Sequence, residues 1–426
     1  MAKQYLTIRQ QPRHLSEKDV EILKDLCATA NDLVNRAIDL VEQYYRDNKK
    51  YIQYEGMYKG LRESPEYKKL NAGMAQQVLR DVDRRYLSYF ALHKMAKSGK
   101  YPQEKCRLPH HVSGNGYAVL ITQRFCLKNG IFYVPVSHPY KRDNGTVKIR
   151  VPPVLHDKAI KEIRIIPKQD AAYFEIAYEY VAGKDDKHLE KKNALAIDLG
   201  IENLAAIAVT NGDTYIIDGR RLKSINQWYN KEIARLESIK KAQGLKRKFT
   251  RKQNEIARKR NNQVNDYINK ATRIIIKYCI EHDIGTVICG NNVISAKHGT
   301  DLGDRLNQIF TLIPLGEFYG KIETYCGLNG IDFIAVDESY TSKASFYDGD
   351  SVPDYDCDNP RAYHFSGSRV KRGLYRTKDG RLVNADINAA YNIMAKAVDR
   401  GRATGIDIDA LRCRGFADEP RRIMIC

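Results

Sequence analysis

The chain has 426 residues, which is long enough for two or three domains with buried cores. Lysine and arginine total 71 against 52 aspartate and glutamate, so the formal net charge is +19. Such an excess favours a polyanionic partner, because basic side chains bind phosphates and release condensed counterions. A solvated basic surface without such a partner is the alternative. The sequence has no run of about 18 apolar residues and no visible signal peptide, which argues against a membrane protein.

The nine cysteines are scattered along the chain, and none belongs to a C-x-x-C pair. This spacing argues against a disulfide framework and against a zinc ribbon. We therefore expect reduced thiols and a cytoplasmic protein.

Two stretches near the N-terminus have the periodicity of amphipathic helices. Apolar residues recur at intervals of three and four from residue 16 to about residue 45, and Ser16 can cap this helix. The same pattern returns between about residues 71 and 96. We expect residues 16–105 to form a helical domain.

The pattern then changes to short strands. Asn129-Gly130, a strong signal for a β-hairpin, lies between apolar runs at residues 117–127 and 131–136. Residues 173–180 alternate with period two. We expect residues 106–182 to form an antiparallel β domain, followed by a charged linker at residues 183–193.

The second half of the chain begins with three short strands, at about residues 194–199, 204–209 and 214–218. Helices and strands then alternate, at about residues 222–243, 246–283, 286–289, 302–328, 332–336 and 386–398. Three antiparallel strands followed by this alternation is the element order of RNase H-like folds, although order alone does not separate them from other α/β folds. Residues 340–382 are expected to be a loop-rich basic stretch and residues 400–426 a weakly structured tail.

Three acidic residues lie at the ends of these apolar elements. Asp198 ends a strand, Glu338 follows another, and Asp386 opens the last helix. A single acid in such a place is more often a helix cap or a salt-bridge partner. Several buried carboxylates repel one another, and a pair of divalent ions about 3.5–4 Å apart would relieve that repulsion and could hydrolyse a phosphodiester. Mg²⁺ suits such oxygen ligands.

Two basic stretches are candidate nucleic-acid contacts. The first shows few acidic partners for i,i+4 pairing, which favours a backbone contact over a solvated helix face. The second interleaves a tyrosine that can stack or pack. The proposed contact residues are Lys246, Arg247, Arg251, Lys252, Arg258 and Lys259 in the first stretch, and Arg369, Lys371, Arg372 and Tyr375 in the second.

The sequence resembles the TnpB family, the transposon-encoded OrfB proteins related to type V CRISPR nucleases. The resemblance covers most of residues 5–398 and includes a middle helix and a following Leu-Ile-Thr-Gln run at 120–123. Its most specific part is four motifs in the family's order: Ala-Ile-Asp-Leu-Gly at 196–200, Asp-Glu-Ser-Tyr-Thr-Ser-Lys-Ala-Ser-Phe at 337–346, the basic run at 369–375, and Asn-Ala-Asp-Ile-Asn-Ala-Ala at 384–390.

The resemblance implies a multidomain α+β fold, in which a helical recognition lobe is inserted in a wedge β-barrel and an RNase H-like (RuvC) α/β nuclease domain follows. The implied domains are the first barrel strand (1–15), the recognition domain (16–105), the rest of the barrel (106–182), a linker (183–193), and the nuclease domain (194–399) with a basic insertion at about 340–382.

The resemblance also implies an RNA-guided DNA endonuclease of the prokaryotic cytosol, one protein with one guide RNA, that cleaves target DNA with Mg²⁺ or Mn²⁺. In such systems base pairing reads most of the target, and the protein reads a short adjacent motif. The catalytic and metal-binding residues would be Asp198, Glu338 and Asp386. Further implied nucleic-acid contacts are Tyr340, Thr341, Ser342 and Lys343, with Gln76 and Gln77 reading the target motif.

The sequence departs from many relatives in two places. Many relatives carry paired C-x-x-C motifs between the second and third acids, where this chain has only Cys357, so we expect no zinc. Many also place the second acid after the strand at 286–289, where this chain has Gly290-Asn291-Asn292. Glu338 follows the next strand, about 4.8 Å away if the two strands are neighbours, and could replace that acid. Asp337 should then point away, because successive residues leave a strand on opposite sides.

Three other functions remain open at this stage. A nuclease-inactive, RNA-guided repressor fits the missing acid near Asn291, although the three retained acids argue against it. A cut-and-paste transposase that acts without RNA would share the fold and the metal chemistry. A compact type V CRISPR effector would share the activity, although the short recognition lobe favours TnpB.

Overall fold

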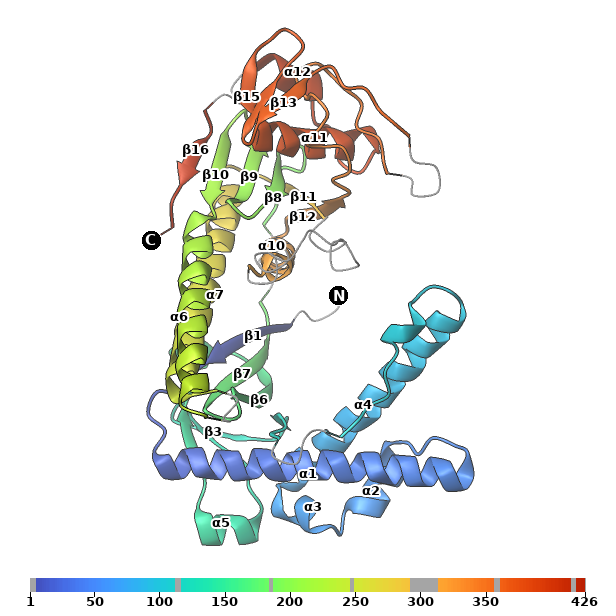
Figure 1. The fold of residues 1–426 in the computed structure, drawn as a ribbon, viewed down its shortest axis with the longest axis vertical. Coiled ribbons are helices and arrows are strands. Elements are labelled where there is room, and N and C mark those ends of the chain that lie inside the picture. Colours follow the sequence, from blue (N-terminus) through green and yellow to red (C-terminus); the bar gives the residue numbers. More distant parts are fainter. Residues whose placement is uncertain are drawn as a thin grey trace. The chain divides into compact units, whose positions relative to one another are not determined.

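The computed structural model describes residues 5–111, 116–183, 187–245, 249–291, 313–355, 361–414 and 419–425. The chain divides into two compact units, residues 1–182 and residues 183–426. The division falls at the start of the segment that the sequence predicts to be a linker. Figure 1 shows the elements of both units.

The helices of the first unit match the two long helices predicted from the sequence. Helix α1 is capped by Ser16, whose side chain accepts a hydrogen bond from the backbone N–H of Asp19 while Asp19 bonds back to the backbone of Ser16. Helix α4 is capped by Asn71. The helical elements are α1 (Glu17–Asn48), α2 (Tyr54–Leu61), α3 (Pro65–Lys69), α4 (Ala72–Lys97), η1 (Gln103–Lys105), α5 (His138–Asn144) and η2 (Pro153–Leu155).

The strands of the first unit form two antiparallel sheets, in the orders β1-β7-β6-β2 and β3-β4-β5. The strands are β1 (Tyr5–Gln10), β2 (Leu120–Thr122), β3 (Cys126–Lys128), β4 (Ile131–Tyr133), β5 (Lys148–Arg150), β6 (Ile160–Lys168) and β7 (Tyr173–Val181).

The predicted hairpin is present, but its first strand is shorter than expected. Asn129 and Gly130 both have positive φ angles, 51° and 69°, as a tight hairpin turn between β3 and β4 requires. The run at 117–127 does not form one strand, because the Thr122 hydroxyl donates to the carbonyl of Arg124 and turns the chain. The part before this turn, β2, therefore joins the other sheet.

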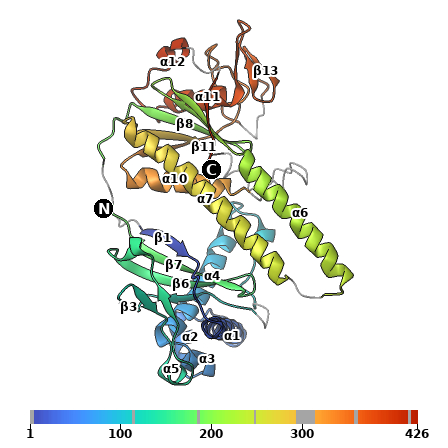
Figure 2. The same ribbon diagram turned by 90° about the vertical axis from the view of Figure 1, so that its left-hand side faces the viewer.

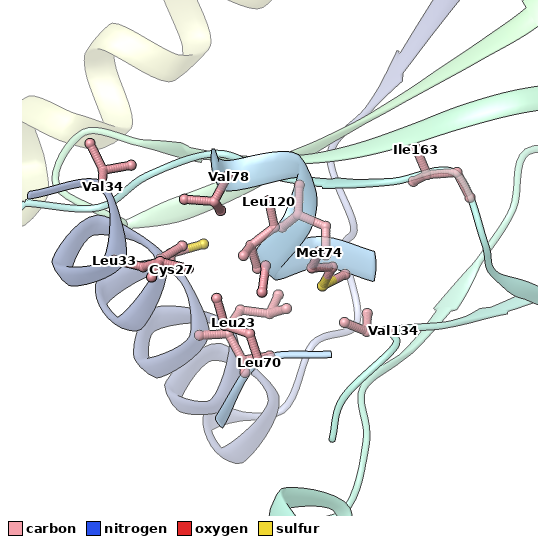
Figure 3. Close-up of a cluster of buried hydrophobic side chains, with 14 of the residues drawn as sticks. Leu23, Cys27, Leu33, Val34, Leu70, Met74, Val78, Leu120, Val134 and Ile163 are labelled. Carbon is pink, nitrogen blue, oxygen red and sulfur yellow. The ribbon is translucent and has the colours of Figure 1, made fainter. Parts of the chain in front are cut away.

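Apolar burial holds the helices against the first sheet. Figure 3 shows this core, in which Leu120 of β2 and Ile163 of β6 lie in the same cluster as buried residues of α1 and α4. Leu23 and Cys27 of α1 and Met74 of α4 are fully buried there. The helices and the sheets of this unit therefore share one core.

The second unit is built on a six-stranded sheet in the order β12-β11-β8-β9-β10-β16. Strand β9 runs antiparallel to both of its neighbours, whereas β11 is parallel to β8 and to β12. The strands are β8 (Ala194–Leu199), β9 (Asn203–Val209), β10 (Thr214–Asp218), β11 (Thr286–Gly290), β12 (Asp332–Val336) and β16 (Arg421–Ile423). The first five agree with the strands predicted from the sequence.

Helices cover both faces of this sheet. One apolar cluster joins the sheet to α7 and α10, and a second joins its other face to α11. Figure 2 shows α6 and α7 as a long helical hairpin. The helices are α6 (Arg220–Ala242), α7 (Arg251–Glu281), α10 (Leu315–Leu328), α11 (Ala385–Asp399) and α12 (Ile408–Arg414). The predicted helix at 302–328 begins outside the described residues.

One expectation for the C-terminal third is incomplete and one is wrong. The stretch at 340–382 is loop-rich, as expected, but it also contains most of a three-stranded antiparallel sheet, β13 (Ser368–Lys371), β14 (Leu374–Arg376) and β15 (Leu382–Asn384). The tail is not weakly structured, because it forms α12 and then β16, which pairs with β10. Neither was visible as a long periodic pattern, because each element is at most seven residues long.

Throughout the described part of the chain, none of the helices combines the length and the apolar character that crossing a membrane would need.

Candidate active site

The sheet register places Asp198 beside the ends of two parallel strands. Ile197 pairs with Cys289, so Asp198 lies beside Gly290, one residue further along. Gly290 in turn pairs with Val336 of β12. Asp198 shares the sheet face of Ala194 and Ala196, which pack toward α11, because alternate residues of a strand point to the same side.

Glu338 reaches the same place from the neighbouring strand. A β-carbon built on Gly290 would lie 2.1 Å from Glu338 Oε1 and 2.5 Å from its Cδ and Cγ atoms. The side chain of Glu338 therefore fills the space that a side chain at residue 290 would need. The glycine at the end of β11 allows a carboxylate from the end of β12 to lie over it.

Asp386 lies in the first turn of α11, and the side chain of Asn384 caps that helix. The helix dipole favours an acid in this position. Two side chains donate to its carboxylate: Asn203 Nδ2 lies 2.6 Å from Oδ2, and Arg369 Nη2 lies 3.4 Å from Oδ1. Asp386 is therefore held by a neutral donor and a cation.

The three carboxylates influence one another. Burial raises the pKa of Asp198 well above its ordinary value, and the charges of Glu338 and Asp386 raise it further, whereas Arg369 opposes the shift. Although some of the surface of Asp198 reaches solvent, its surroundings are densely packed. The structure therefore brings the three predicted acids into one electrostatic cluster.

The fit of this cluster to a divalent ion depends on its chemistry and its geometry. The donors are all carboxylates, which suit Mg²⁺ or Mn²⁺, and their mutual repulsion is the kind that a cation relieves. Within the described ranges, however, no three His, Cys, Asp or Glu side chains converge as a ready metal-binding group. Asp386 faces Asn203 and Arg369 instead, so it would have to exchange the bond from Arg369 for an ion.

A ladder of polar side chains on α11 fixes the segment that follows Glu338. Asn388, Asn392 and Lys396 are buried and spaced four residues apart, so they share one face of the helix. Asn388 accepts from the backbone N–H of Phe346 and donates to the carbonyl of Ala344. Asn392 donates to the carbonyl of Ala344 as well. We call these three residues the α11 ladder.

Lys396, the last residue of the α11 ladder, explains the orientation of Asp337. Its ammonium group lies 3.3 Å from Asp337 Oδ1 and 3.1 Å from Asp354 Oδ1, and it also donates to the carbonyl of Ser339. Burial opposes ionisation of Asp337, but hydrogen bonds from Ser339 and the charge of Lys396 outweigh it and lower its pKa. Asp337 therefore faces a lysine while Glu338 faces Gly290.

The loop that carries Glu338 contains four residues predicted to bind nucleic acid. Thr341 is buried, and its hydroxyl donates to the carbonyl of Glu338, so it shapes the turn and does not present its side chain to a ligand. Ser342 and Lys343 are exposed. Tyr340 has a positive φ of 64° and packs edge-on against Tyr363. Of the four predicted residues, the exposed Ser342 and Lys343 are therefore the better contact surface.

The residues of the small sheet that were predicted to bind nucleic acid are also partly exposed and partly buried. Arg369, Lys371 and Arg372 are exposed, and Arg372 lies 3.5 Å from Glu202. Tyr375 is fully buried, and its hydroxyl donates to the carbonyl of Lys343. Tyr375 therefore packs inside the small sheet and cannot stack on a base.

Glu255, the one acid in the first basic stretch, pairs with two of its basic residues. Arg251 and Lys252 lie 3.4 and 3.8 Å from Glu255, so the expectation of no i,i+4 pairing is wrong for Arg251. These pairs are exposed and contribute little. Arg258 and Lys259 are also exposed. The predicted contacts Lys246 and Arg247 lie outside the described residues, as does Cys357.

The two adjacent glutamines of α4 have different surroundings. Gln77 lines a cleft of about 240 Å³ in the first unit, together with Asp81, Arg85 and Arg164. Its amide donates to Gln123 Oε1 at 3.2 Å. Gln76 is not among the lining residues and bonds to Tyr67. Of the two glutamines, Gln77 therefore lines this cleft.

Sequence reasoning missed the residues that hold Asp386 and the segment carrying Glu338. Asn203 and the α11 ladder make their contacts across more than 40 residues of chain, and no local pattern marks such pairs. One signal was available, since Asn388, Asn392 and Lys396 recur at a spacing of four in a helix whose other residues are mostly apolar.

Two family profiles match the chain. The first, described as the probable transposase OrfB_IS605, matches residues 175–295 and so contains Asp198. The second, described as the Cas12f1-like TNB domain, matches residues 316–393 and contains Glu338 and Asp386. The chain is therefore similar to the TnpB (OrfB) proteins over both of the segments that carry the predicted acids.

Two relatives illustrate the extent of the similarity. A TnpB-like protein, ORF457 of Acidianus two-tailed virus, is 24% identical, and the alignment covers 92% of this chain and 86% of the relative. A Cas12f1–sgRNA–target DNA complex has a similar protein fold, with a TM-score of 0.51 at 18% identity, covering 89% of this chain and 83% of that chain. The chain thus has a mixed α+β multidomain fold similar to that of Cas12f1.

We predict that Asp198→Asn stabilises the metal-free protein at neutral pH. Because the pKa of Asp198 is raised in the folded state, its ionisation costs folding free energy. This cost is absent below the unfolded-state pKa of about 3.9, grows as the pH rises, and is complete above the raised folded-state pKa. The thermal midpoint in EDTA should rise by roughly 2–4 °C per kcal/mol relieved, and the gain should shrink as the pH falls.

The control for this prediction is Asp332→Asn. It removes an exposed carboxylate at the first residue of β12, the end of that strand far from Glu338, and should leave the thermal midpoint nearly unchanged. A lower midpoint for Asp198→Asn at neutral pH would show that the carboxylate is stabilised by its surroundings, contrary to the repulsion described above.

Proposed function

We propose that this protein is an RNA-guided DNA endonuclease, and that its second unit is an RNase H-like (RuvC) nuclease domain with Asp198, Glu338 and Asp386 as its acids. The observation that carries the proposal is the position of Glu338 over Gly290, beside Asp198 and on the α11 side of the sheet. The strand order β12-β11-β8-β9-β10, with β9 antiparallel, supports the RNase H-like assignment.

In this proposal the three acids would hold Mg²⁺ or Mn²⁺, and a bound ion would supply an activated water and charge stabilisation for the leaving oxygen of a phosphodiester. The protein positions these acids before substrate arrives. Asn384 caps the helix that carries Asp386, and the α11 ladder fixes the segment that carries Glu338. Arg369 lies beside Asp386 and, once released from it, can contact a phosphate of the strand to be cut.

The partners in this proposal are a guide RNA and a target DNA, with no zinc and no membrane. The net charge of +19 and the exposed basic residues of α7 and the small sheet support a polyanionic partner. The wedge β-barrel of the family remains part of the proposal for the first unit. Gln77, in its cleft, is the better of the two glutamines to read a target-adjacent motif.

The contacts of Asp386 favour one alternative, a nuclease-inactive RNA-guided repressor. With Arg369 and Asn203 on its carboxylate, Asp386 does not face a metal position. A cleavage assay discriminates the two functions. The protein is purified with its RNA, the RNA is sequenced, and a plasmid that carries the matching target is incubated with Mg²⁺ and, separately, with EDTA. Linear plasmid only with Mg²⁺ supports the nuclease, and stable binding without cleavage supports the repressor.

We predict that Glu338→Gln abolishes cleavage and preserves guided DNA binding. The amide keeps the shape of the side chain but removes the charge, and loss of one such group in a reaction centre costs roughly 100- to 1000-fold in rate. Asp332→Asn, at the other end of β12, is the control and should cut normally. Normal cutting by Glu338→Gln would exclude this residue as the second acid.

A second variant tests the space that Glu338 fills. Gly290→Ala should displace the carboxylate, because the added β-carbon would lie 2.1 Å from Oε1, and cleavage should fall to the level of Glu338→Gln. Gly320→Ala is matched to it, since no atom lies within 4 Å of that β-carbon. It should cut normally. Full activity of Gly290→Ala would contradict the placement of Glu338.

We also predict that the basic face of α7 contributes to RNA or DNA binding. Replacing Arg251, Lys252, Arg258 and Lys259 by glutamine should weaken binding and flatten its salt dependence by about one unit of slope per lost phosphate contact. Lys270 and Lys277 lie further along α7 and pair with acids, so replacing these two lysines by glutamine gives a control on the same helix. An unchanged affinity and slope would show that the basic residues form only a solvated face.

A further inference from the structure

The C-terminal strand β16 is an edge strand of the six-stranded sheet. Strand β16 pairs in parallel with β10, with Arg422 opposite Ile216, and lies at the edge of the sheet in Figure 1. Ile425 is buried in the core on the α7 side, and its carbonyl accepts a hydrogen bond from Arg221 at 2.8 Å. The tail therefore occupies a defined place relative to the sheet.

Arg422 uses this position to contact two residues of the preceding strands. Its Nη1 atom lies 3.0 Å from Asn203 Oδ1 and 3.0 Å from Asp218 Oδ2. The side chain of Asp218 is nearly inaccessible to solvent, whereas the side chain of Arg422 is 37% exposed. Arg422 thus bridges the first residue of β9 and the last residue of β10.

The bond from Arg422 fixes which way the Asn203 amide faces. A guanidinium can only donate, so the atom of Asn203 that it meets must be the oxygen. The amide nitrogen then faces the opposite way, and it donates to Asp386 Oδ2 at 2.6 Å. If the amide turned over, its oxygen would face the carboxylate of Asp386 and its nitrogen would face a cation, and both contacts would be repulsive.

We propose that Arg422 is a positioning residue for the nuclease site, which orients Asp386 through the amide of Asn203. The inference rests on the proposed function, and it gives the C-terminal tail a role in it. Arg422 itself touches neither the substrate nor the other two acids in this proposal. It acts by keeping the amide of Asn203 on Oδ2 of Asp386. The other oxygen, Oδ1, is bound by Arg369 in this structure and is the one that would be available to a metal ion.

Stabilisation of Asp218 alone does not account for Arg422. Arg220 already donates to Asp218 from its backbone N–H at 2.7 Å and from Nε at 2.8 Å, and its Nη2 atom lies 2.6 Å away. Asp218 would therefore keep its partners without the tail. The contact that depends on Arg422 is the one to Asn203.

The test is a double-mutant cycle in the full chain. Arg422→Met, Asn203→Ala and the double variant are compared, with Arg421→Met as the matched control. Arg421 is the preceding residue of the same strand, so its side chain points to the other side and its loss removes the same charge. Two quantities are measured: the affinity for Mn²⁺, from the electron paramagnetic resonance signal of the free ion, and the rate of guided cleavage.

In both single variants the affinity for Mn²⁺ and the rate of guided cleavage should each fall about 10-fold. This is the lower end of the usual loss when a residue that orients a metal ligand is removed. The double variant should lose no more than Asn203→Ala alone, because Arg422 acts through that residue. Arg421→Met should stay within about twofold of the unsubstituted protein. Additive losses, or unchanged Mn²⁺ affinity and cleavage in Arg422→Met, would overturn the inference.

Two further outcomes separate folding and function from this inference. If Arg422→Met does not fold, Arg422→Lys replaces it, because an ammonium group keeps a positive charge near Asp218 but ends one bond short of the Nη1 atom that reaches Asn203. Equal Mn²⁺ affinity in Arg422→Lys and Asn203→Ala then supports the inference, and an affinity unchanged by the lysine overturns it. If the unsubstituted protein neither binds Mn²⁺ nor cuts, the proposed function itself fails.

Discussion

The missing β-carbon at residue 290 determines where the second carboxylate can lie. On the α11 face, a side chain at residue 290 and the side chain of Glu338 would need the same space. Because residue 290 is a glycine, Glu338 occupies that space. Asp198 lies beside it, so the site is compact even though its acids come from separated segments. Any larger residue at 290 would exclude Glu338, and the cluster would lose one of its three acids.

The other polar contacts of the second unit follow from this arrangement. A glutamate at the end of β12 is useful only if the loop behind it is fixed, and the α11 ladder fixes that loop through its backbone. The same helix carries Asp386 in its first turn. Helix α11 therefore carries Asp386 and also holds the segment that follows Glu338. It fixes the positions of these two acids relative to each other.

Local sequence predicted the strands and the acids, because both depend on short-range patterns. The apolar run before Asp198 marks a buried strand, and period-two geometry placed Glu338 and Asp337 on opposite sides, with the family resemblance favouring Glu338. The tail was misjudged because β16 has only three residues and gains its stability from pairing with β10. Tyr375 was misjudged because a tyrosine in a basic run looks exposed until the small sheet closes over it. Such residues depend on contacts that are distant in the sequence.

Arg369 links the basic surface to the acid cluster. It is exposed on β13 and also lies 3.4 Å from Asp386, so it lowers the repulsion around Asp198 in the protein alone. A guanidinium that turns to a phosphate gives up part of that contact, since its donors lie in one plane and point outward from it. In the proposed nuclease, binding of the substrate strand would therefore release an oxygen of Asp386 just where an ion is needed. Asn203 would keep its hold on the other oxygen, because its amide is fixed from behind and does not depend on Arg369.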